Sequence, residues 1–554
     1  MTRWRAWLPA SGLMLALAAT VLEAAAAEAL SAAAQRGAVI YRDGLLPSGL
    51  ALAGARADGT PVTGRAAACI SCHRASGMGG AEGAILVPPV QAALLFAPGQ
   101  RKPGRQPRVA RGLQLQLPKF QTRPAYDLQS LQLALNQGRS ADGTALGSLM
   151  PRYAISTEDN ANLAAYLASL QSGNPPGLQG QPIHLASVID GDASPRRRQA
   201  LLDTLSACLG PEDSAAPEQP HAQIPLIWHQ WHVNGEPSTW PEQLARHQQR
   251  QPVFALVSGL SDRAWQPVQQ FCESEQMPCL LPNAPGVDPA QPGNWSFHFS
   301  RGVALEASLI ETDLRLAALG GSLLQLVDGS EAAAMAARVL AERIGDLKLT
   351  NQIRMLDDNR ETSLATGKMI AALQPGDQLV LWLGPAELAA LTAAWPPPVG
   401  VTVYLSGELG GLDAVPLAPA WREQAKVAYA YQAADRRIGR QILNAGTLLR
   451  AQGDAIKADL VLLQGNSYSA CEMSVRSLRV MGEQVSRRWL LELFEAADES
   501  ALATGYPRFT LGPGQRVGSR GGHLMRFDPQ RPTRLQPISD WIVPDWAEVE
   551  DARP

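Results

Sequence analysis

The chain has 554 residues, of which 18% are charged and 46% are hydrophobic, and its formal net charge is -3. This length predicts roughly two to four domains. The near-neutral charge balance argues against a nucleic-acid partner, and the lack of a Gly-x4-Gly-Lys-Ser/Thr loop argues against a nucleotide-driven motor.

Residues 1–27 have the layout of a secretory signal peptide. Two early arginines precede the short apolar run 13–22, and small residues follow it. The run is too short to span a bilayer comfortably, so cleavage after Ala26 or Ala27 is expected rather than a membrane anchor. No later segment of the sequence reaches the roughly eighteen continuous apolar residues of a spanning helix. The mature protein is therefore predicted to be periplasmic, with no membrane span.

Residues 69–73 read Cys-Ile-Ser-Cys-His. This spacing is typical of covalent haem attachment, because two thiols can bond the two vinyl groups of one porphyrin while the histidine ligates the iron. A thioredoxin-type motif would need a preceding strand, and a Gly-rich, turn-prone run stands there instead. A zinc site would need a second ligand pair, and a simple disulfide leaves the histidine unexplained. The motif predicts one haem c on Cys69 and Cys72, with His73 as an axial iron ligand.

Three short helices are expected around this motif. The first covers AAAQRGAVIYRDG, the second runs over Asp127–Gln137 and stops at Gly138, and the third follows Ser156 as its N-cap. Met150 lies in a Gly-rich loop just before Pro151. Proline favours extended backbone in the residue before it, so this methionine is expected to project from a loop.

Together these features resemble class I cytochrome c over residues 28–172, which implies a small all-α domain. The resemblance implies Met150 as the second axial ligand of the iron. Met78 is the weaker alternative, because it lies only five residues after His73 and would have to reach the opposite haem face. The family also has a prolyl carbonyl that accepts from the proximal histidine and a contact between its first and last helices. The corresponding residues here are Pro88 or Pro89 for the carbonyl, and Gly37, Tyr41 and Tyr166 for the helix contact.

Histidine and methionine together would fill both axial positions of the iron, so the resemblance implies electron transfer rather than oxygen chemistry. Near this domain, residues 97–124 contain seven basic residues and no acidic one. Such a segment either docks an acidic redox partner or is a solvated loop.

A Gly- and Pro-rich linker at residues 173–181 is followed by a different pattern. Over residues 182–554, short apolar strands alternate with amphipathic helices, which predicts α/β structure with parallel sheets covered by helices on both faces. The stretch "VFALVSGLSDRAW", with "CLLPNAPGV" and "WSFHFSRGVALEASLI" further on, resembles the type I periplasmic binding proteins of the Leu/Ile/Val-binding kind. This resemblance implies two lobes with a hinge and a ligand cleft between them.

In such a fold, ligands bind at the carboxyl ends of the strands. The positions of this sequence that correspond to the cleft wall are Ser258, Gly259, Ser261, Asn283 and Ala284. Asn283 and Pro285 depart from the small hydroxylic residues that the family's amino-acid-binding members have there, which speaks against an amino acid as the ligand.

Four further cysteines are expected to be paired, because an exported protein meets an oxidising compartment. Cys272 and Cys279 end one helix and begin the next strand, which predicts a disulfide if the helix ends near Met277. The resemblance puts Cys208 and Cys471 in helices of one lobe, which implies a second disulfide.

No catalytic group emerges from the sequence, so no enzyme activity is predicted. His229 and His232 share one expected strand, but their spacing predicts side chains on opposite faces rather than a metal site.

The sequence thus predicts a periplasmic mono-haem cytochrome that transfers electrons and is fused to a ligand- or partner-binding domain. Its redox partner would be an exported dehydrogenase or another cytochrome. The alternative is a solute-binding or sensor protein of the branched-chain amino acid type, in which the cytochrome is an accessory reporter. A third hypothesis is an assembly factor for an exported oxidoreductase.

Overall fold

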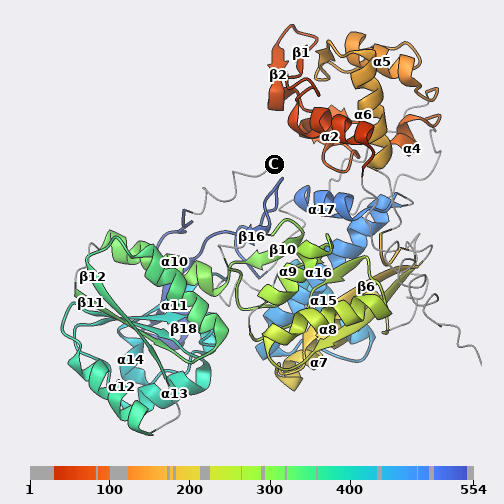
Figure 1. The fold of residues 1–554 in the computed structure, drawn as a ribbon. Helices are drawn as coiled ribbons and strands as arrows, with labels where there is room; N and C mark the ends of the chain where they lie inside the picture. Colours follow the sequence, from red (N-terminus) through yellow and green to blue (C-terminus); the bar gives the residue numbers. More distant parts are fainter. Residues whose placement is uncertain are drawn as a thin grey trace, which may run out of the picture. The chain divides into compact units, whose positions relative to one another are not determined.

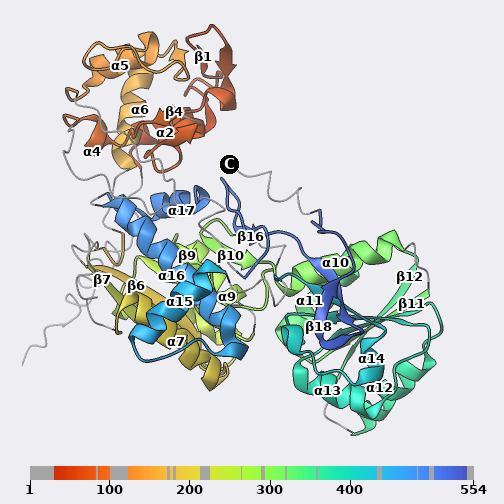
Figure 2. The same cartoon turned by 180° about the vertical axis from the view of Figure 1, so that it is seen from behind.

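The computed structural model describes residues 30–82, 85–99, 123–170, 175–178, 182–212, 225–263, 265–288, 293–317, 321–356, 360–432, 439–482, 484–497 and 505–545. The chain forms two compact units, with the division next to Gly173 (Figures 1 and 2). The predicted signal peptide and most of the basic segment 97–124 lie outside the described residues. Within the described ranges, no helix is long and apolar enough to cross a membrane.

The first unit is built on three helices whose ends follow local sequence rules. Ser31 and Ser156 accept hydrogen bonds from backbone N–H groups as N-caps, and Asp127 and Ser130 form a capping box. Gly44 and Gly138 end two of these helices with φ of 64° and 65°, which glycine adopts without strain. The helices of this unit are α2 (Ala32–Asp43), α3 (Ile70–His73), α4 (Ala92–Leu95), α5 (Leu128–Gln137) and α6 (Thr157–Ser169).

Helices α2 and α6 pack closely at Gly37, as the sequence predicts. A Cβ atom on Gly37 would lie 2.0 Å from the carbonyl oxygen of Asn162, so only glycine permits this approach. Tyr41 and Tyr166 contact each other beside it, with ring centroids 5.2 Å apart. Both tyrosines are fully buried.

The first unit also contains short strands, so the expectation of an all-α domain is incomplete. Part of the Gly-rich run upstream of the motif folds back on itself, because Gly59 turns with φ of 86° and Asp58 accepts from the backbone N–H of Thr60. One sheet has the order β2-β1-β5 and the other is the hairpin β3-β4. Their bounds are β1 (Ala53–Ala55), β2 (Pro61–Thr63), β3 (Gly80–Glu82), β4 (Ile85–Val87) and β5 (Arg152–Tyr153).

The second unit has two lobes, each with its own sheet and helices (Figure 1). In the first lobe, six strands follow the order β16-β10-β9-β8-β6-β7 and all pair in parallel. The strands are β6 (Ile183–Asp190), β7 (Leu226–Val233), β8 (Ala255–Val257), β9 (Cys279–Leu280), β10 (Ser296–Ser300) and β16 (Val517–Ser519). The helices are α7 (Pro195–Leu209), α8 (Trp240–Arg250), α9 (Gln266–Ser274), α15 (Arg440–Ala451), α16 (Val461–Met481) and α17 (Arg487–Glu495).

The second lobe has the strand order β12-β11-β13-β14-β15-β17-β18. Its first five strands are parallel, but β17 and β18 pair antiparallel, which the expectation of purely parallel sheets did not include. The strands are β11 (Gly321–Val327), β12 (Leu349–Met355), β13 (Gln378–Trp382), β14 (Thr402–Ser406), β15 (Ala425–Tyr429), β17 (His523–Asp528) and β18 (Arg531–Pro537). The helices are α10 (Val303–Leu316), α11 (Glu331–Arg343), α12 (Arg360–Ala372), α13 (Pro385–Ala394) and α14 (Pro419–Arg422).

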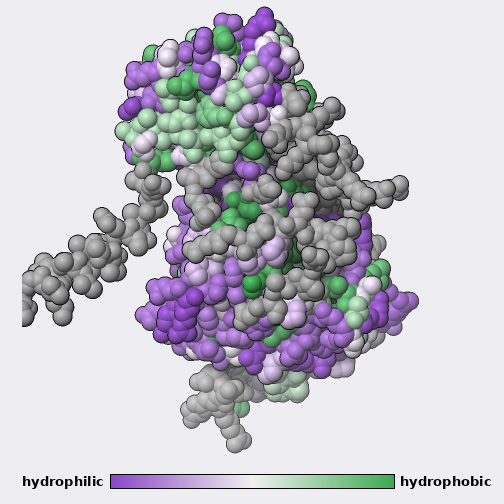
Figure 3. Space-filling model, turned by 90° about the vertical axis from the view of Figure 1, so that its right-hand side faces the viewer, coloured by the Kyte–Doolittle hydropathy of each residue, from purple (hydrophilic) through white to green (hydrophobic). Residues whose placement is uncertain are grey.

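Each lobe buries its central strands almost completely, whereas the edge strand β12 is largely exposed. The face of the second unit drawn in Figure 3 is mostly hydrophilic. The chain passes between the lobes three times: after β10, after β15 and after β16. Two disulfides tie the first lobe together. Cys208–Cys471 joins α7 to α16, and Cys272–Cys279 joins α9 to β9.

Candidate functional site

The predicted cleft wall of the first lobe lies where β8 and β9 end, and the structure brings its members together. Ser258 and Gly259 follow β8 with φ of 58° and 133°. The side-chain amide of Asn283 donates to Ser258 Oγ at 3.2 Å, to the Gly259 carbonyl at 3.3 Å and to Ser467 Oγ of α16 at 3.2 Å. Ala284 packs against the apolar core of the lobe.

Ser261, the remaining predicted wall residue, is also bonded inside the protein. Its hydroxyl donates to Asp190 Oδ2 at 3.0 Å and accepts from the backbone N–H of Arg263. Asp190 is 1% exposed and is paired with the Arg263 guanidinium. The hydroxyl and amide groups of this wall are therefore engaged by protein partners.

A second group of polar side chains lies at the carboxyl end of β14 in the other lobe. Glu306, in the first turn of α10, is fully buried and accepts from Ser406 Oγ and, at 2.9 Å, from the backbone N–H of Glu408. Burial raises the pKa of Glu306 well above its usual value, because it disfavours the charged carboxylate.

Glu408 is half-buried, and its carboxylate has no hydrogen-bond partner among the residues that the structure describes. Burial raises the pKa of Glu408 to about 7, an effect that Arg197 opposes and Asp262 reinforces. Arg197 and Asp262 belong to the first lobe, where they form an ion pair of 3.0 Å. Charged groups of the first lobe therefore act electrostatically on Glu408 of the second lobe.

Tyr506 and Asn466 complete this arrangement. Tyr506 stacks on Phe299 with ring centroids 5.3 Å apart, and Tyr431 lies against it at 5.0 Å. Burial, together with the charges of Glu408 and Glu306, raises the pKa of Tyr506. The Asn466 amide nitrogen donates to Tyr506 Oη over 3.5 Å.

The other polar atom of Asn466 stands out. Asn466 is 5% exposed, and its Oδ1 has no hydrogen-bond partner within the described ranges. A buried acceptor in this state costs about 1–3 kcal/mol, which a ligand that donates to it would recover. We refer to Glu306, Glu408, Asn466 and Tyr506 as the acceptor cluster.

Sequence reasoning missed the acceptor cluster, because its members come from four distant segments. Two signals were present. Glu306 interrupts the run of small and apolar residues "RGVALEASLI", and Glu408 follows directly after the apolar strand "VYLSG". A lone carboxylate in a buried segment is rarely left without a role.

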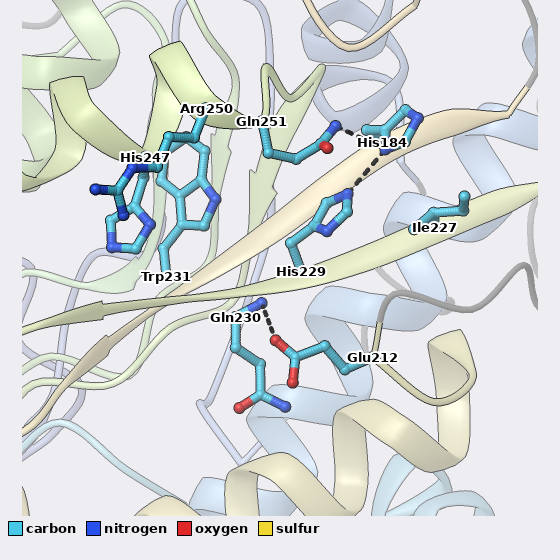
Figure 4. Close-up of a pocket in the computed structure, with 9 residues that line it drawn as sticks. All are labelled: His184, Glu212, Ile227, His229, Gln230, Trp231, His247, Arg250 and Gln251. Atoms are coloured by element: carbon cyan, nitrogen blue, oxygen red, sulfur yellow. Dashed lines mark hydrogen bonds between the residues drawn. The ribbon is translucent and has the colours of Figure 1, made fainter.

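A pocket of about 440 Å³ lies elsewhere in the first lobe, beside strand β7 (Figure 4). His184 Nδ1 and His229 Nε2 are 2.8 Å apart, and the Gln251 amide nitrogen lies 3.1 Å from the same His184 atom. The two rings are almost parallel, at 4°, with centroids 5.1 Å apart. This separation equals the nitrogen contact plus one ring radius at each end, so the rings meet edge to edge.

His229 is buried whereas His232 is exposed, as expected for opposite faces of the strand. Among the described residues, no group of three or more His, Cys, Asp or Glu side chains is arranged to hold a metal ion.

In the first unit, the Cys-Ile-Ser-Cys-His motif forms the single turn α3 and its N-cap. His73 is 7% exposed, and its Nδ1 lies 2.9 Å from the Pro88 carbonyl oxygen, so Pro88 rather than Pro89 contacts the imidazole. Gly79 permits this approach, since a Cβ there would lie 2.2 Å from the Val87 carbonyl oxygen. Burial lowers the pKa of His73, which keeps the imidazole neutral.

The two thiols and the two methionines of this unit differ in exposure. Cys69 and Cys72 form no disulfide and are half-buried, and burial raises the pKa of Cys69 to about 12. Met150 is half-buried and packs against the core of the unit, whereas Met78 is fully buried.

The second unit has the fold of the type I periplasmic binding proteins, with two lobes of mainly parallel strands and three connecting segments. A branched-chain amino acid ABC transporter protein from Thermus thermophilus with bound valine matches with a TM-score of 0.50 and 12% identity, over 66% of this chain and 98% of that chain. At this identity the likeness concerns the fold alone.

Two further solved structures are similar. A substrate-binding protein from Aeropyrum pernix matches at 9% identity and a TM-score of 0.49, over 67% of this chain and 100% of that chain. A solute-binding protein from R. palustris in complex with benzoate matches at 12% identity and a TM-score of 0.48, over 66% and 98%. No family model and no curated protein matches the chain. The solved structures give no support for a cytochrome fold in the first unit.

Proposed function

We propose that this chain is an exported binding protein whose second unit takes a small ligand between its lobes, at the acceptor cluster. The unpartnered Asn466 Oδ1 carries the proposal, because a buried acceptor without a donor is explained by a ligand that supplies one. The binding-protein fold supports it, since ligands of open α/β sheets bind at the carboxyl ends of strands, where Glu408 stands.

A ligand screen on the full chain tests this function. Small molecules of several classes would be added and the unfolding temperature measured, because a ligand that binds only the folded state raises it. We expect at least one class to stabilise the protein, and to do so less in an Asn466→Leu variant. Stabilisation by no class would contradict the proposal.

We propose further that the first unit carries one haem c on Cys69 and Cys72, with His73 as an axial ligand. The donor set fits this group: the thiols of Cys69 and Cys72 form no disulfide, and they lie at the N-cap and inside the turn whose histidine is bonded through Nδ1, which leaves Nε2 as the ligating atom. The Pro88 carbonyl holds the ring orientation and the tautomer. Haem would supply one-electron redox chemistry. Met150 remains the proposed second ligand, with Met78 as its rival.

Mass analysis of the mature protein tests this part. We expect a haem adduct on the peptide that contains residues 69–73, and its loss in a Cys69→Ser/Cys72→Ser variant. A peptide without adduct, from a host that attaches haem, would contradict the assignment. The redox partner, a dehydrogenase or another cytochrome, stays a prediction from the sequence. In this proposal, ligand binding is the main function and the haem is an accessory to it.

A further inference from the structure

A ligand bound through a carboxylate needs hydrogen-bond donors, and the cleft wall and the acceptor cluster do not offer free ones. Ser258, Ser261 and Asn283 would be the donors for such a group, and each is bonded to a protein partner. By contrast, the Glu408 carboxylate and Asn466 Oδ1 are hydrogen-bond acceptors that have no partner within the described residues. A ligand that completes this site must supply hydrogen-bond donors.

The charges around Glu408 give the sign of the ligand's charge. Glu408 and Asp262 are anionic when ionised, Arg197 is cationic, and burial disfavours the charged form of Glu306. One cation and two anions leave a single negative charge. The Arg197 charge is taken up by Asp262 at 3.0 Å, so the Glu408 carboxylate is the uncompensated member.

The aromatic side chains beside these groups suit the same kind of ligand. Tyr506 contacts the rings of Phe299 and Tyr431, with centroid separations of 5.3 and 5.0 Å. Aromatic rings attract cations, and they also bury the apolar part of an alkyl chain. A group that is cationic at one end and apolar behind it would meet both requirements.

We infer that the ligand of the second unit is a protonated aliphatic amine without a carboxylate, whose ammonium group donates to Glu408 and to Asn466 Oδ1. This inference rests on the proposed binding function and names the ligand class for the same site. The inferred ligand differs from valine and benzoate, which are bound in two of the similar structures and both carry a carboxylate.

Three probes with the same carbon chain separate the head groups: butylamine, butanoate and butanol. Each would be added to the full chain, with valine and benzoate beside them, and the unfolding temperature and the calorimetric affinity measured. We expect butylamine to raise the unfolding temperature by a few degrees and the other compounds to leave it unchanged. Binding of butylamine should strengthen between pH 6 and pH 8, because the pKa of Glu408 is about 7 and its ionised carboxylate attracts the ammonium group.

Two variants locate the site. Glu408→Gln keeps the shape but removes the charge, and Asn466→Leu removes the acceptor; each should weaken butylamine binding about tenfold or more. Glu342→Gln, the same change at an exposed position of the same lobe, should leave it unaltered. The melting curve without ligand shows whether each variant folds.

The outcomes are distinguishable. Stabilisation by butanoate, valine or benzoate alone would overturn the ligand class and leave the binding function standing. Stabilisation by no compound would overturn both. Butylamine binding that is equal in wild type and in both folded variants would overturn the site.

Discussion

Arg263 and Asp190 form a two-pronged ion pair at the edge of the first lobe's sheet. Arg263 Nη2 lies 2.8 Å from Asp190 Oδ1, and Nε lies 3.1 Å from Oδ2. The same guanidinium reaches Asp192 and the Gly235 carbonyl, and it stacks over the Trp240 ring. This pair fixes the loops after three strands and holds Ser261 away from any ligand.

We expect Arg263→Met to lower the free energy of unfolding by about 3–5 kcal/mol, because it leaves the buried Asp190 carboxylate unpaired. Urea unfolding of the full chain measures the change. Arg338→Met is the matched control, since the Arg338–Asp288 pair is more exposed and should cost about 1 kcal/mol or less. Equal losses in the two variants would contradict the structural role given to Asp190.

The carboxyl groups of Glu306 and Glu408 predict a fall in stability as the pH rises. Both have raised pKa values, so the folded state keeps protons that the unfolded chain releases, and the free energy of unfolding decreases from about pH 4.5 through pH 7. The difference in the free energy of unfolding between Glu408→Gln and the wild type should therefore be more favourable to the variant at pH 8 than at pH 5, by about 1–3 kcal/mol. Unfolding curves at the two pH values, with Glu342→Gln as the control, check this; an unchanged pH slope in Glu408→Gln would refute it.

The lowered pKa of His298 predicts the opposite trend at acid pH, where stability should fall as the pH falls. It is 4% exposed, and burial followed by the charge of Arg301 lowers its pKa to about 3. The unfolded chain therefore binds a proton that the folded chain does not, and stability is lost as the pH falls below about 6.5. His298→Gln should flatten this part of the profile, measured by thermal unfolding between pH 4 and pH 7. A profile as steep as that of the wild type would show that other groups cause the loss.

The two disulfides should differ in their contribution to stability. Cys208–Cys471 closes a loop of 263 residues, whereas Cys272–Cys279 closes one of 7. On the chain-entropy account, the first is worth about 5 kcal/mol and the second about 2 kcal/mol. Paired Cys→Ser variants of each disulfide, compared by urea unfolding, test the order. A larger loss at the short loop would mean that strain or packing, not chain entropy, dominates.

Gly37→Ala should destabilise the first unit by about 1–3 kcal/mol, because the new methyl group would press on the Asn162 carbonyl and part α2 from α6. Gly147→Ala is the control, since a Cβ atom there meets nothing within 4 Å. Thermal unfolding followed by circular dichroism measures both. If Gly147→Ala loses as much stability as Gly37→Ala, the close packing of α2 and α6 is not the cause of the loss.

Local signals in the sequence predicted much of this structure. The strand and helix alternation, the caps at Gly138 and Ser156, and the Gly37 contact all depend on residues close in sequence or on strong steric limits. The antiparallel β17 and β18 were not predicted, because pairing direction depends on which strand lies next to them in space. The acceptor cluster was missed for the same reason, since Glu306, Glu408, Asn466 and Tyr506 meet only after folding.

The late position of β16, β17 and β18 has a consequence for biogenesis. These strands complete the sheets of both lobes, yet they lie within residues 517–537 of the sequence. A growing chain cannot close either lobe before these strands have been synthesised, since each sheet lacks an outer part until then. For the export proposed above, such a delay would keep the chain competent for translocation. A truncation before residue 517 should accordingly leave the two lobes open to proteolysis.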